Sequence, residues 1–341
     1  MATLSTGALT LYDAAKRLDP NGSVATVAEL LSQMNDNLED MVVVEGNLPT
    51  GHRVSIRTGL PTVYFRQINA GVPTSKSTTA QVDEGVALME AYSELDERLV
   101  KLNGNGQAFR LSEDKPFIEA MNQQQTSTMF YGNVATDQKT YTGLSTRYGT
   151  ISGAGNAVNI IDAGGTGSDN SSVWLIGWGV NTIFCTYPKG TQAGLQMNDL
   201  GKDTVIDAVG GRFQAWRTQF VWENGLVVKD WRYGVRIANV DVSDLIGQSA
   251  TQANTAATQL IYLMSRAMDR LPAWNDIRPV FYMNRTHYSM LRIAALGKSN
   301  NALAIDDALN QFGNPMKGRL TFQGIPIRNV DQLTLAETRV V

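Results

Sequence analysis

The chain contains 341 residues, of which 43% are hydrophobic and 18% charged, and its formal net charge is -3. This length and apolar content are sufficient for a substantial core in two or three layers or lobes. So few charges, with acids in slight excess, argue against a protein whose main task is to bind nucleic-acid phosphates, because that task needs clustered cations. A container that encloses DNA without binding it tightly remains compatible with this composition.

Targeting and membrane signals are not evident. No apolar run reaches the length that a bilayer crossing needs, which excludes a membrane span. The first twenty residues lack the basic-then-apolar pattern of a secretory signal. Cys185 is the only cysteine, so no intramolecular disulfide can form, and we expect synthesis in a reducing cytoplasm.

The first seventy residues predict two short helices followed by extended chain. The helices are expected over 9–18 and 24–38, on either side of the turn sequence DPNG. Residues 42–68 then alternate apolar and polar side chains between turn signals, and TVYFRQI at 62–68 is expected to form one of the strands. Because a two-stranded ribbon is marginal alone, we expect it to project and to lie on its own body or on another chain.

Residues 78–103 predict one long amphipathic helix. Glu94 and Glu97 form i,i+4 pairs with Arg98 and Lys101, and Gly104 is a natural stop for a helix. An ordinary core helix would show the same periodicity. The apolar positions, at steps of three and four, are Val82, Val86, Met89, Tyr92, Leu95, Leu99 and Leu102.

The remaining chain interleaves helices with a β-rich middle, which predicts an α+β fold. A helix is expected from Ser112 to about Met129. The sequence Asn224-Gly225 is expected to close a hairpin, because Asn-Gly is the strongest short hairpin signal. The other expected elements are strands within 172–188, 212–222, 226–242, 278–284 and 319–330, with the last range hinged at Gly324, and helices over 252–271 and 285–296.

Residues that could carry catalysis are scarce. His52 and His287 are the only histidines, and neither lies at metal-ligand spacing, so we interpret both as surface or hydrogen-bonding residues. Cys185 has apolar neighbours on an expected strand and is interpreted as a small core residue. The glycine-rich stretches at 152–158 and 164–170 lack the further residues of a dinucleotide-binding or phosphate-binding loop. No catalytic, cofactor-binding or metal site is therefore predicted.

Several segments carry a family resemblance. One reads GLPTVYFRQINAGVPTSKSTTAQVDEGVALMEAYSELDERLVKLNGN, and others occupy 109–133, 160–179, 187–201, 230–245, 278–286 and 322–331. In this collinear order they resemble the major capsid proteins of short-tailed bacteriophages of the epsilon-15 type. The resemblance covers most of the chain after the first forty residues and implies the Hong Kong 97-type (HK97-like) capsid fold.

By this resemblance the chain would have five parts. Residues 1–41 would form an N-terminal arm, 42–77 an extended loop (a β-ribbon), 78–245 a spine helix over 78–103 with a β-rich peripheral domain, 246–330 an axial domain, and 331–341 a C-terminal strand or tail. The extended loop is expected to lie across an adjacent subunit. The candidate residues for this intersubunit contact are the cations Arg53, Arg57 and Arg66 and the carboxylates Glu90, Glu94 and Glu97.

The implied function is mechanical and not enzymatic. Many copies would form hexamers and pentamers that close into an icosahedral virion capsid around double-stranded DNA, without sequence-specific DNA binding, a cofactor or a membrane. Assembly would take place in the cytoplasm of a bacterial host. A portal and a decoration or cement protein are candidate partners.

Two alternatives stay open. A nanocompartment shell of the encapsulin type would have the same fold but enclose protein cargo, and nucleic acid inside purified particles would discriminate between the two. From a different class, a β-rich glycan-binding or glycan-active protein could use the tryptophans of the middle region, although core or intersubunit packing explains them more simply. A monomer in light scattering would favour the glycan reading.

Overall fold

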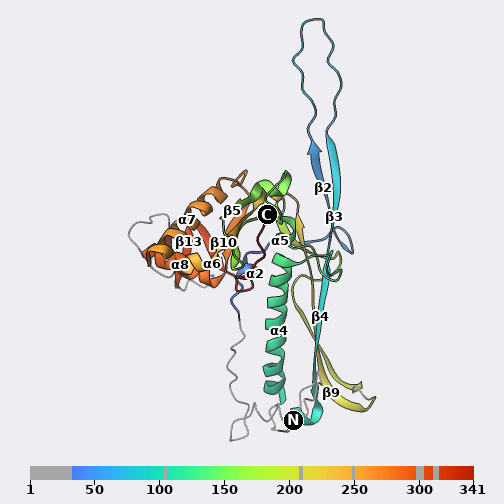
Figure 1. Cartoon of the computed structure of the whole chain (residues 1–341). Coiled ribbons are helices and arrows are strands. Elements are labelled where there is room, and N and C mark those ends of the chain that lie inside the picture. Colours follow the sequence, from blue (N-terminus) through green and yellow to red (C-terminus); the bar gives the residue numbers. More distant parts are fainter. Residues whose placement is uncertain (1–32, 103–105, 207–209, 248–249, 297–302, 310–314) are drawn as a thin grey trace. The chain divides into compact units, whose positions relative to one another are not determined.

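The computed structural model describes residues 33–102, 106–206, 210–247, 250–296, 303–309 and 315–341 (Figure 1). The chain divides into two compact units. Of the described residues, unit 1 contains Gln33, Leu88–Gln125 and Gln192–Glu223, and unit 2 contains Met34–Ala87, Thr126–Thr191 and Asn224–Val341. Helix α4 (Gly106–Tyr131) and strand β9 (Arg212–Val228) have residues in both units.

Unit 2 is built on a sheet with strand β6 (Asn170–Trp178) inside it. The strand order is β12 (Leu303–Leu309), β13 (Pro315–Phe322), β14 (Ile325–Asn329), β11 (Arg278–Met283), β6 and β7 (Ile183–Tyr187). Strand β10 (Gly234–Asp241) pairs antiparallel with β6, β5 (Ile160–Asp162) pairs parallel with β10, and β1 (Val43–Glu45) pairs parallel with β7. Every residue of β6 is buried, because neighbours cover both its edges and both its faces.

Two hydrophobic cores pack against opposite faces of this sheet. Val173 and Leu175 of β6 belong to the core that includes helices α7 (Ala250–Met268) and α8 (Arg285–Leu296). Trp174 and Trp178 belong to the other core, together with the end of α4. This alternation follows the two-residue repeat of a strand. Both tryptophans are fully buried, so the packing role expected for them is confirmed and they present no glycan-binding surface.

An antiparallel hairpin, formed by β2 (Gly51–Gly59) and β3 (Thr78–Gly85), belongs to unit 2. Its register pairs Gly51 with Gly85 at one end and Gly59 with Thr78 at the other. The extended chain expected here is confirmed. The strand expected at 62–68 is wrong, because residues 60–77 form a loop that has no partner strand (Figure 1).

The helix predicted over 78–103 is wrong. These residues form β3, then β4 (Ala87–Asp96), and only the short helix α3 (Glu97–Lys101) is helical. A helical stripe would place all its apolar members on one face, whereas Val82 and Tyr92 are exposed and Leu95 is buried. In β4 the more buried side chains are every second residue, which is strand periodicity. The steps of three and four in the apolar pattern were coincidental.

The long helix of the described chain is α4, which confirms and extends the helix expected over 112–129. The sequence placed the start near Ser112 because proline is favoured in a first helical turn. In the structure α4 begins at Gly106 and contains Pro116 in its interior. The long helix therefore lies at 106–131 and not at 78–103, and the assignment of a spine helix stays a prediction.

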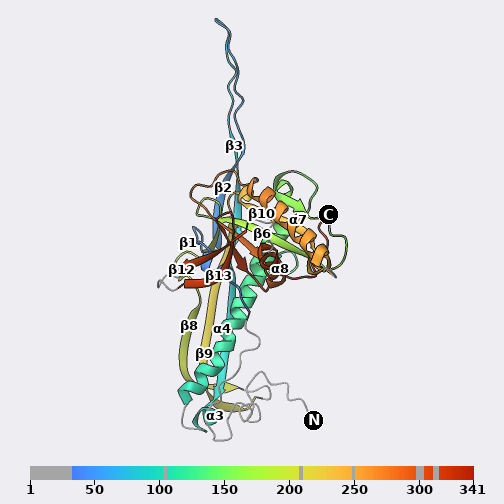
Figure 2. The same ribbon diagram turned by 90° about the vertical axis from the view of Figure 1, so that its left-hand side faces the viewer.

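Strand β9 runs through the Asn224-Gly225 sequence, so the hairpin predicted there is wrong. Residues 212–221 pair with β8 (Gln196–Ile206), and residues 225–228 pair with β7. Figure 2 shows β8 and β9 side by side along their length. A Cβ atom on Gly225 would lie 2.6 Å from the carbonyl oxygen of Gly85, so this glycine permits a close approach of two backbones and not a turn.

Several other predictions are confirmed. Strands β6 and β7 lie within 172–188 apart from the first two residues of β6, and α7, β11 and α8 occupy the expected ranges. Gly324, at a φ of +83°, links β13 to β14 as predicted. The helix expected over 9–18 and the first part of that over 24–38 lie outside the described residues. The short elements are α2 (Asn37–Asp40), α5 (Leu144–Arg147), α6 (Val242–Ile246), η1 (Gly155–Asn159) and η2 (Trp231–Tyr233).

None of the helices within the described ranges combines the length and apolar character that a bilayer crossing demands.

Candidate functional site: an exposed loop on an anchored hairpin

Among the described residues of unit 2, the loop between β2 and β3, residues 60–77, is the most exposed apolar segment. We refer to it as the exposed loop. Leu60, Val63, Phe65 and Ile68 are 81%, 88%, 109% and 92% exposed. Large apolar side chains that gather in one short segment with no cover mark an interaction surface, because leaving them in water is unfavourable.

The hairpin below this loop is anchored to the rest of unit 2 by an ion pair. Nη1 and Nη2 of Arg147, at the end of α5, donate to Oε1 and Oε2 of Glu84 on β3 at 2.7 and 2.6 Å. Nη2 also donates to the carbonyl oxygen of Leu226 at 3.4 Å. The two side chains are 15% and 10% exposed, so little water competes with this bidentate contact.

Packing adds to this anchor on the β2 side. The ring of His52 meets the ring of Phe184 edge-on with centroids 5.3 Å apart, and Val54 is buried against Phe184 and Val227. Burial lowers the pKa of His52, with a smaller contribution from the charge of Lys229. His52 therefore acts as a packing residue at the hairpin base.

The three arginines predicted to contact a neighbouring subunit all lie in this hairpin region. Arg53 is already paired within its own chain, because its Nε and Nη2 donate to Oδ1 and Oδ2 of Asp83 at 2.6 and 2.7 Å. The hydrogen bond from Arg53 lowers the pKa of Asp83. Arg57 and Arg66 are exposed, and in the described part of the chain neither forms an ion pair.

The three glutamates predicted as their partners lie in unit 1 and also have partners in their own chain. Nε of Arg217 donates to Oε1 of Glu94 at 3.0 Å. The ammonium groups of Lys101 and Lys202 both contact Glu97, and they lower the pKa of its carboxyl group to about 2.

The third glutamate, Glu90, accepts hydrogen bonds from neutral groups. The hydroxyl of Tyr92 donates to Glu90 at 2.6 Å, and the amide of Gln219 donates to the same carboxylate. These hydrogen bonds lower the pKa of Glu90, and the bond from Tyr92 makes the larger contribution. The intersubunit pairing of the predicted arginines with these glutamates stays a prediction, and it would compete with these internal contacts.

Sequence reasoning missed Arg147, Asp83 and Glu84. The helix predicted for 78–103 includes Asp83 and Glu84, so neither residue was expected on a strand. A hairpin register between GHRVSIRTG and TTAQVDEG would have placed Asp83 opposite Arg53, an opposite-charge cross-strand pair. No comparable pattern points to Arg147, because its contact depends on the tertiary fold.

A second buried ion pair fixes the segment 331–341 onto unit 2. Nη2 of Arg236 donates to Oε2 of Glu337 at 2.9 Å, and both side chains are nearly inaccessible. Tyr131 donates to Oε1 of Glu337 at 2.6 Å, and Ser172 donates to Oε2. Burial, followed by the charge of Glu337, raises the pKa of Tyr131. Every polar atom of this carboxylate therefore has a partner, which is a structural arrangement.

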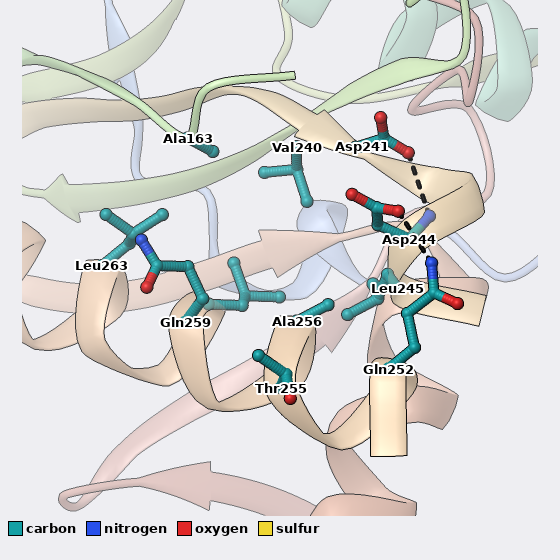
Figure 3. A pocket seen from close by; sticks show the side chains of 11 residues that line it. Ala163, Val240, Asp241, Asp244, Leu245, Gln252, Thr255, Ala256, Gln259 and Leu263 are labelled. Atoms are coloured by element: carbon teal, nitrogen blue, oxygen red, sulfur yellow. Dashed lines mark hydrogen bonds between the residues drawn. The ribbon is translucent and has the colours of Figure 1, made fainter. Parts of the chain in front are cut away.

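The cavity in Figure 3 has a volume of about 600 Å³ and lies between the end of β10, α6 and α7. Its two carboxylates already accept hydrogen bonds, Asp241 from the backbone N–H of Asp244 and Asp244 from the amide of Gln252. The residues that line it include no histidine, cysteine or lysine. Nothing in this lining assembles a nucleophile with a base.

The other candidate chemical groups are packing residues. Cys185 is buried, and burial raises the pKa of its thiol to about 12, as expected of a core cysteine. Within the described ranges, no group of three His, Cys, Asp or Glu side chains lies close enough to hold a metal ion.

Comparison with known proteins gives one family match. Residues 19–341 match the family described as major capsid protein GP7. A search of curated protein sequences returned no match. Among solved structures, the chain is similar to the near-atomic resolution structure of bacteriophage Epsilon15, with 29% identity and a TM-score of 0.74 over 100% of this chain and 99% of that chain.

Two further solved structures are less similar. The capsid of bacteriophage JBD30 is 9% identical, with a TM-score of 0.49 over 90% of this chain and 95% of that chain. The encapsulin complex of Synechococcus elongatus is 11% identical, with a TM-score of 0.44 over 69% of this chain and 98% of that chain.

Proposed function

The chain belongs to the major capsid protein GP7 family and is a shell-forming viral structural protein with the HK97-like fold, and from this premise we propose that the exposed loop, residues 60–77, holds each copy to its neighbour in the shell. The single observation that carries the proposal is the loop's set of four uncovered apolar side chains on an anchored hairpin. A viral shell supplies what such a loop requires, namely a second copy of the chain at a fixed position.

The energetics favour this arrangement. Burying one large apolar side chain contributes roughly 1.5 to 3 kcal/mol, so several such side chains stabilise each contact substantially. Because every copy repeats the contact, and because copies are linked through rigid bodies, moderate pairwise energies add up to a stable shell. The Arg147–Glu84 anchor limits the motion of the hairpin, which lowers the entropy lost when the loop is ordered on a neighbour.

The finer picture extends this proposal. We infer hexamers and pentamers that close into an icosahedral shell around double-stranded DNA, assembled in the cytoplasm of a bacterial host, with a portal and a decoration or cement protein as partners. The net charge of -3 supports an enclosure that leaves the DNA mobile, since a strongly cationic lining would bind phosphates. Nucleic-acid content of purified particles tests the genome as cargo.

The test removes the loop and keeps the hairpin. Because Gly59 and Thr78 are paired in register, residues 60–77 can be replaced by Asn-Gly, which suits a two-residue hairpin turn. A larger deletion of 50–72 would also remove strand β2 and confuse the result. We expect folded subunits by circular dichroism and no shells by negative-stain microscopy. Shells of normal size and yield from this variant would refute the role of the loop.

A further inference from the structure

A groove with an excess of positive charge lies beside the end of β2 that leads into the exposed loop, in unit 2. Its volume is about 560 Å³. One wall is formed by residues 55–60 of the hairpin, and the other by Asn181 and residues 229–232. The hairpin wall is held in place by the Arg147–Glu84 pair and by the packing of Val54, so the groove is preformed.

The charges that line the groove are not balanced. It contains three cations, Arg57, Lys229 and Arg232, and one carboxylate, Asp230, which gives 3 - 1 = 2 net positive charges. The carboxylate of Asp230 is already paired with Arg232, whose Nε and Nη2 donate to its two oxygens at 3.0 and 2.7 Å. Nζ of Lys229 donates to the neutral Oδ1 of Asn181, at 2.8 Å.

Of the three cations that line the groove, Arg57 and Lys229 are the two without a carboxylate partner in the described part of the chain. Arg53, Arg147, Arg217 and Arg236 are each paired with a carboxylate. Within the described residues, neither Arg57 nor Lys229 forms an ion pair. Two uncompensated cations in a concave recess create a positive potential that favours an anionic group, and arginine offers that group two parallel donors.

We infer that this groove receives a carboxylate-bearing segment of a second copy of this chain, with the carboxylate seated between Arg57 and Lys229. The inference rests on the proposed function and names a further contact for it. Leu60 lines the groove and also begins the exposed loop, so the groove is continuous with the surface proposed to contact a neighbour. Each copy carries 32 acidic against 29 basic side chains, so a neighbour has carboxylates to supply.

The direct test is zero-length cross-linking of assembled particles with a carbodiimide, which joins an amine to a carboxylate only where the two are in contact. Subunits labelled with ¹⁵N are mixed with unlabelled subunits before reassembly, so that mass spectrometry identifies links between different copies. We expect a Lys229-to-Asp/Glu peptide of mixed isotope composition in particles and not in dissociated subunits. The variant Arg57→Lys should give a second link to the same acidic segment.

Charge reversal provides the second arm. Arg57→Glu with Lys229→Glu should lower the yield of particles at least tenfold while the circular dichroism spectrum of the subunits stays unchanged. The matched control is Arg278→Glu, at an exposed arginine in the first position of β11 and outside the groove, which should assemble normally.

The outcomes separate the two proposals. If the unaltered chain forms no particles, the proposed function fails. If it forms particles in which Lys229 is linked only to Asp230 of its own copy or to nothing, the groove inference is overturned while the shell function stands. If the double variant forms particles of normal size and yield that retain less nucleic acid, the occupant is a phosphate backbone, and the inference of a second copy is also overturned.

Discussion

Arg147 and Glu84 form a bidentate, largely buried ion pair that joins helix α5 to strand β3, with donor–acceptor distances of 2.7 and 2.6 Å. The two residues are 63 positions apart in the sequence. We predict that Arg147→Met lowers the free energy of unfolding by about 3 kcal/mol, because it leaves a buried carboxylate without a counter-charge. Chemical denaturation of dissociated subunits measures this loss.

A second readout locates the effect. Hydrogen exchange should accelerate in β2 and β3 of the Arg147→Met variant before it accelerates in β6. Arg53→Gln breaks the exposed pair with Asp83 in the same hairpin and serves as the control, with no measurable change in the unfolding midpoint expected. Equal destabilisation by the two substitutions would contradict the assignment of Arg147 as the anchor.

The exposed loop allows a prediction that separates assembly from stability. Phe65 is 109% exposed, so Phe65→Ser removes no contact within the subunit and should leave its unfolding curve unchanged. If the loop contacts a neighbour, the same substitution removes about 2 kcal/mol of apolar burial from every copy. The concentration of subunits needed for particle formation, measured by light scattering, should then rise at least tenfold. An unchanged assembly threshold would place Phe65 outside the contact.

The sequence predicted best where a local pattern agrees with the tertiary packing. The helices at 250–268 and 285–296 each bury one face against the sheet. The amphipathic periodicity of these segments indicates such a one-sided burial. The apolar runs of β6 and β11 were recognisable because strands buried on both faces are almost continuously apolar. The predicted i,i+4 pair of Glu97 and Lys101 is also present, in the short helix α3.

The failures have a common physical origin. Residues 78–96 form strands whose partners lie elsewhere in the chain, and the exposure of Val82 and Tyr92 cannot be read from a local window. Gly225 resembles a turn residue but is required by the approach of Gly85. For the candidate site, the sequence identified the hairpin and its arginines. It could not identify Arg147, whose contact with Glu84 exists only after the chain has folded.

The segment 331–341 provides a stability test through Glu337. Glu337→Gln keeps the shape of the side chain but leaves the guanidinium of Arg236, which is 4% exposed, without its counter-charge. We expect a loss of about 3 to 5 kcal/mol in the free energy of unfolding. The exposed pair between Arg53 and Asp83 gives the control, since Arg53→Gln should lower the free energy of unfolding by less than about 1 kcal/mol. A small effect of Glu337→Gln would show that water reaches Arg236.

His287 makes the stability of unit 2 depend on pH. It lies in the first turn of α8, is fully buried, and neither ring nitrogen has a hydrogen-bond partner in the described structure. Burial lowers its pKa from 6.5 to about 4. Between these two values the unfolded chain binds a proton that the folded chain does not, so stability falls as pH decreases from about 6.5 towards 4 and levels off below.

The size of this effect follows from the pKa difference. A shift from 6.5 to about 4 corresponds to roughly 3 kcal/mol, since each pH unit contributes about 1.4 kcal/mol. Replacing the imidazole by an apolar group, as in His287→Leu, should remove this part of the pH dependence. Unfolding free energies of the two proteins at pH 7.5 and at pH 4, compared as a difference of differences, provide the measurement. If both proteins lost the same stability over this interval, His287 would be protonated equally in the folded and unfolded states.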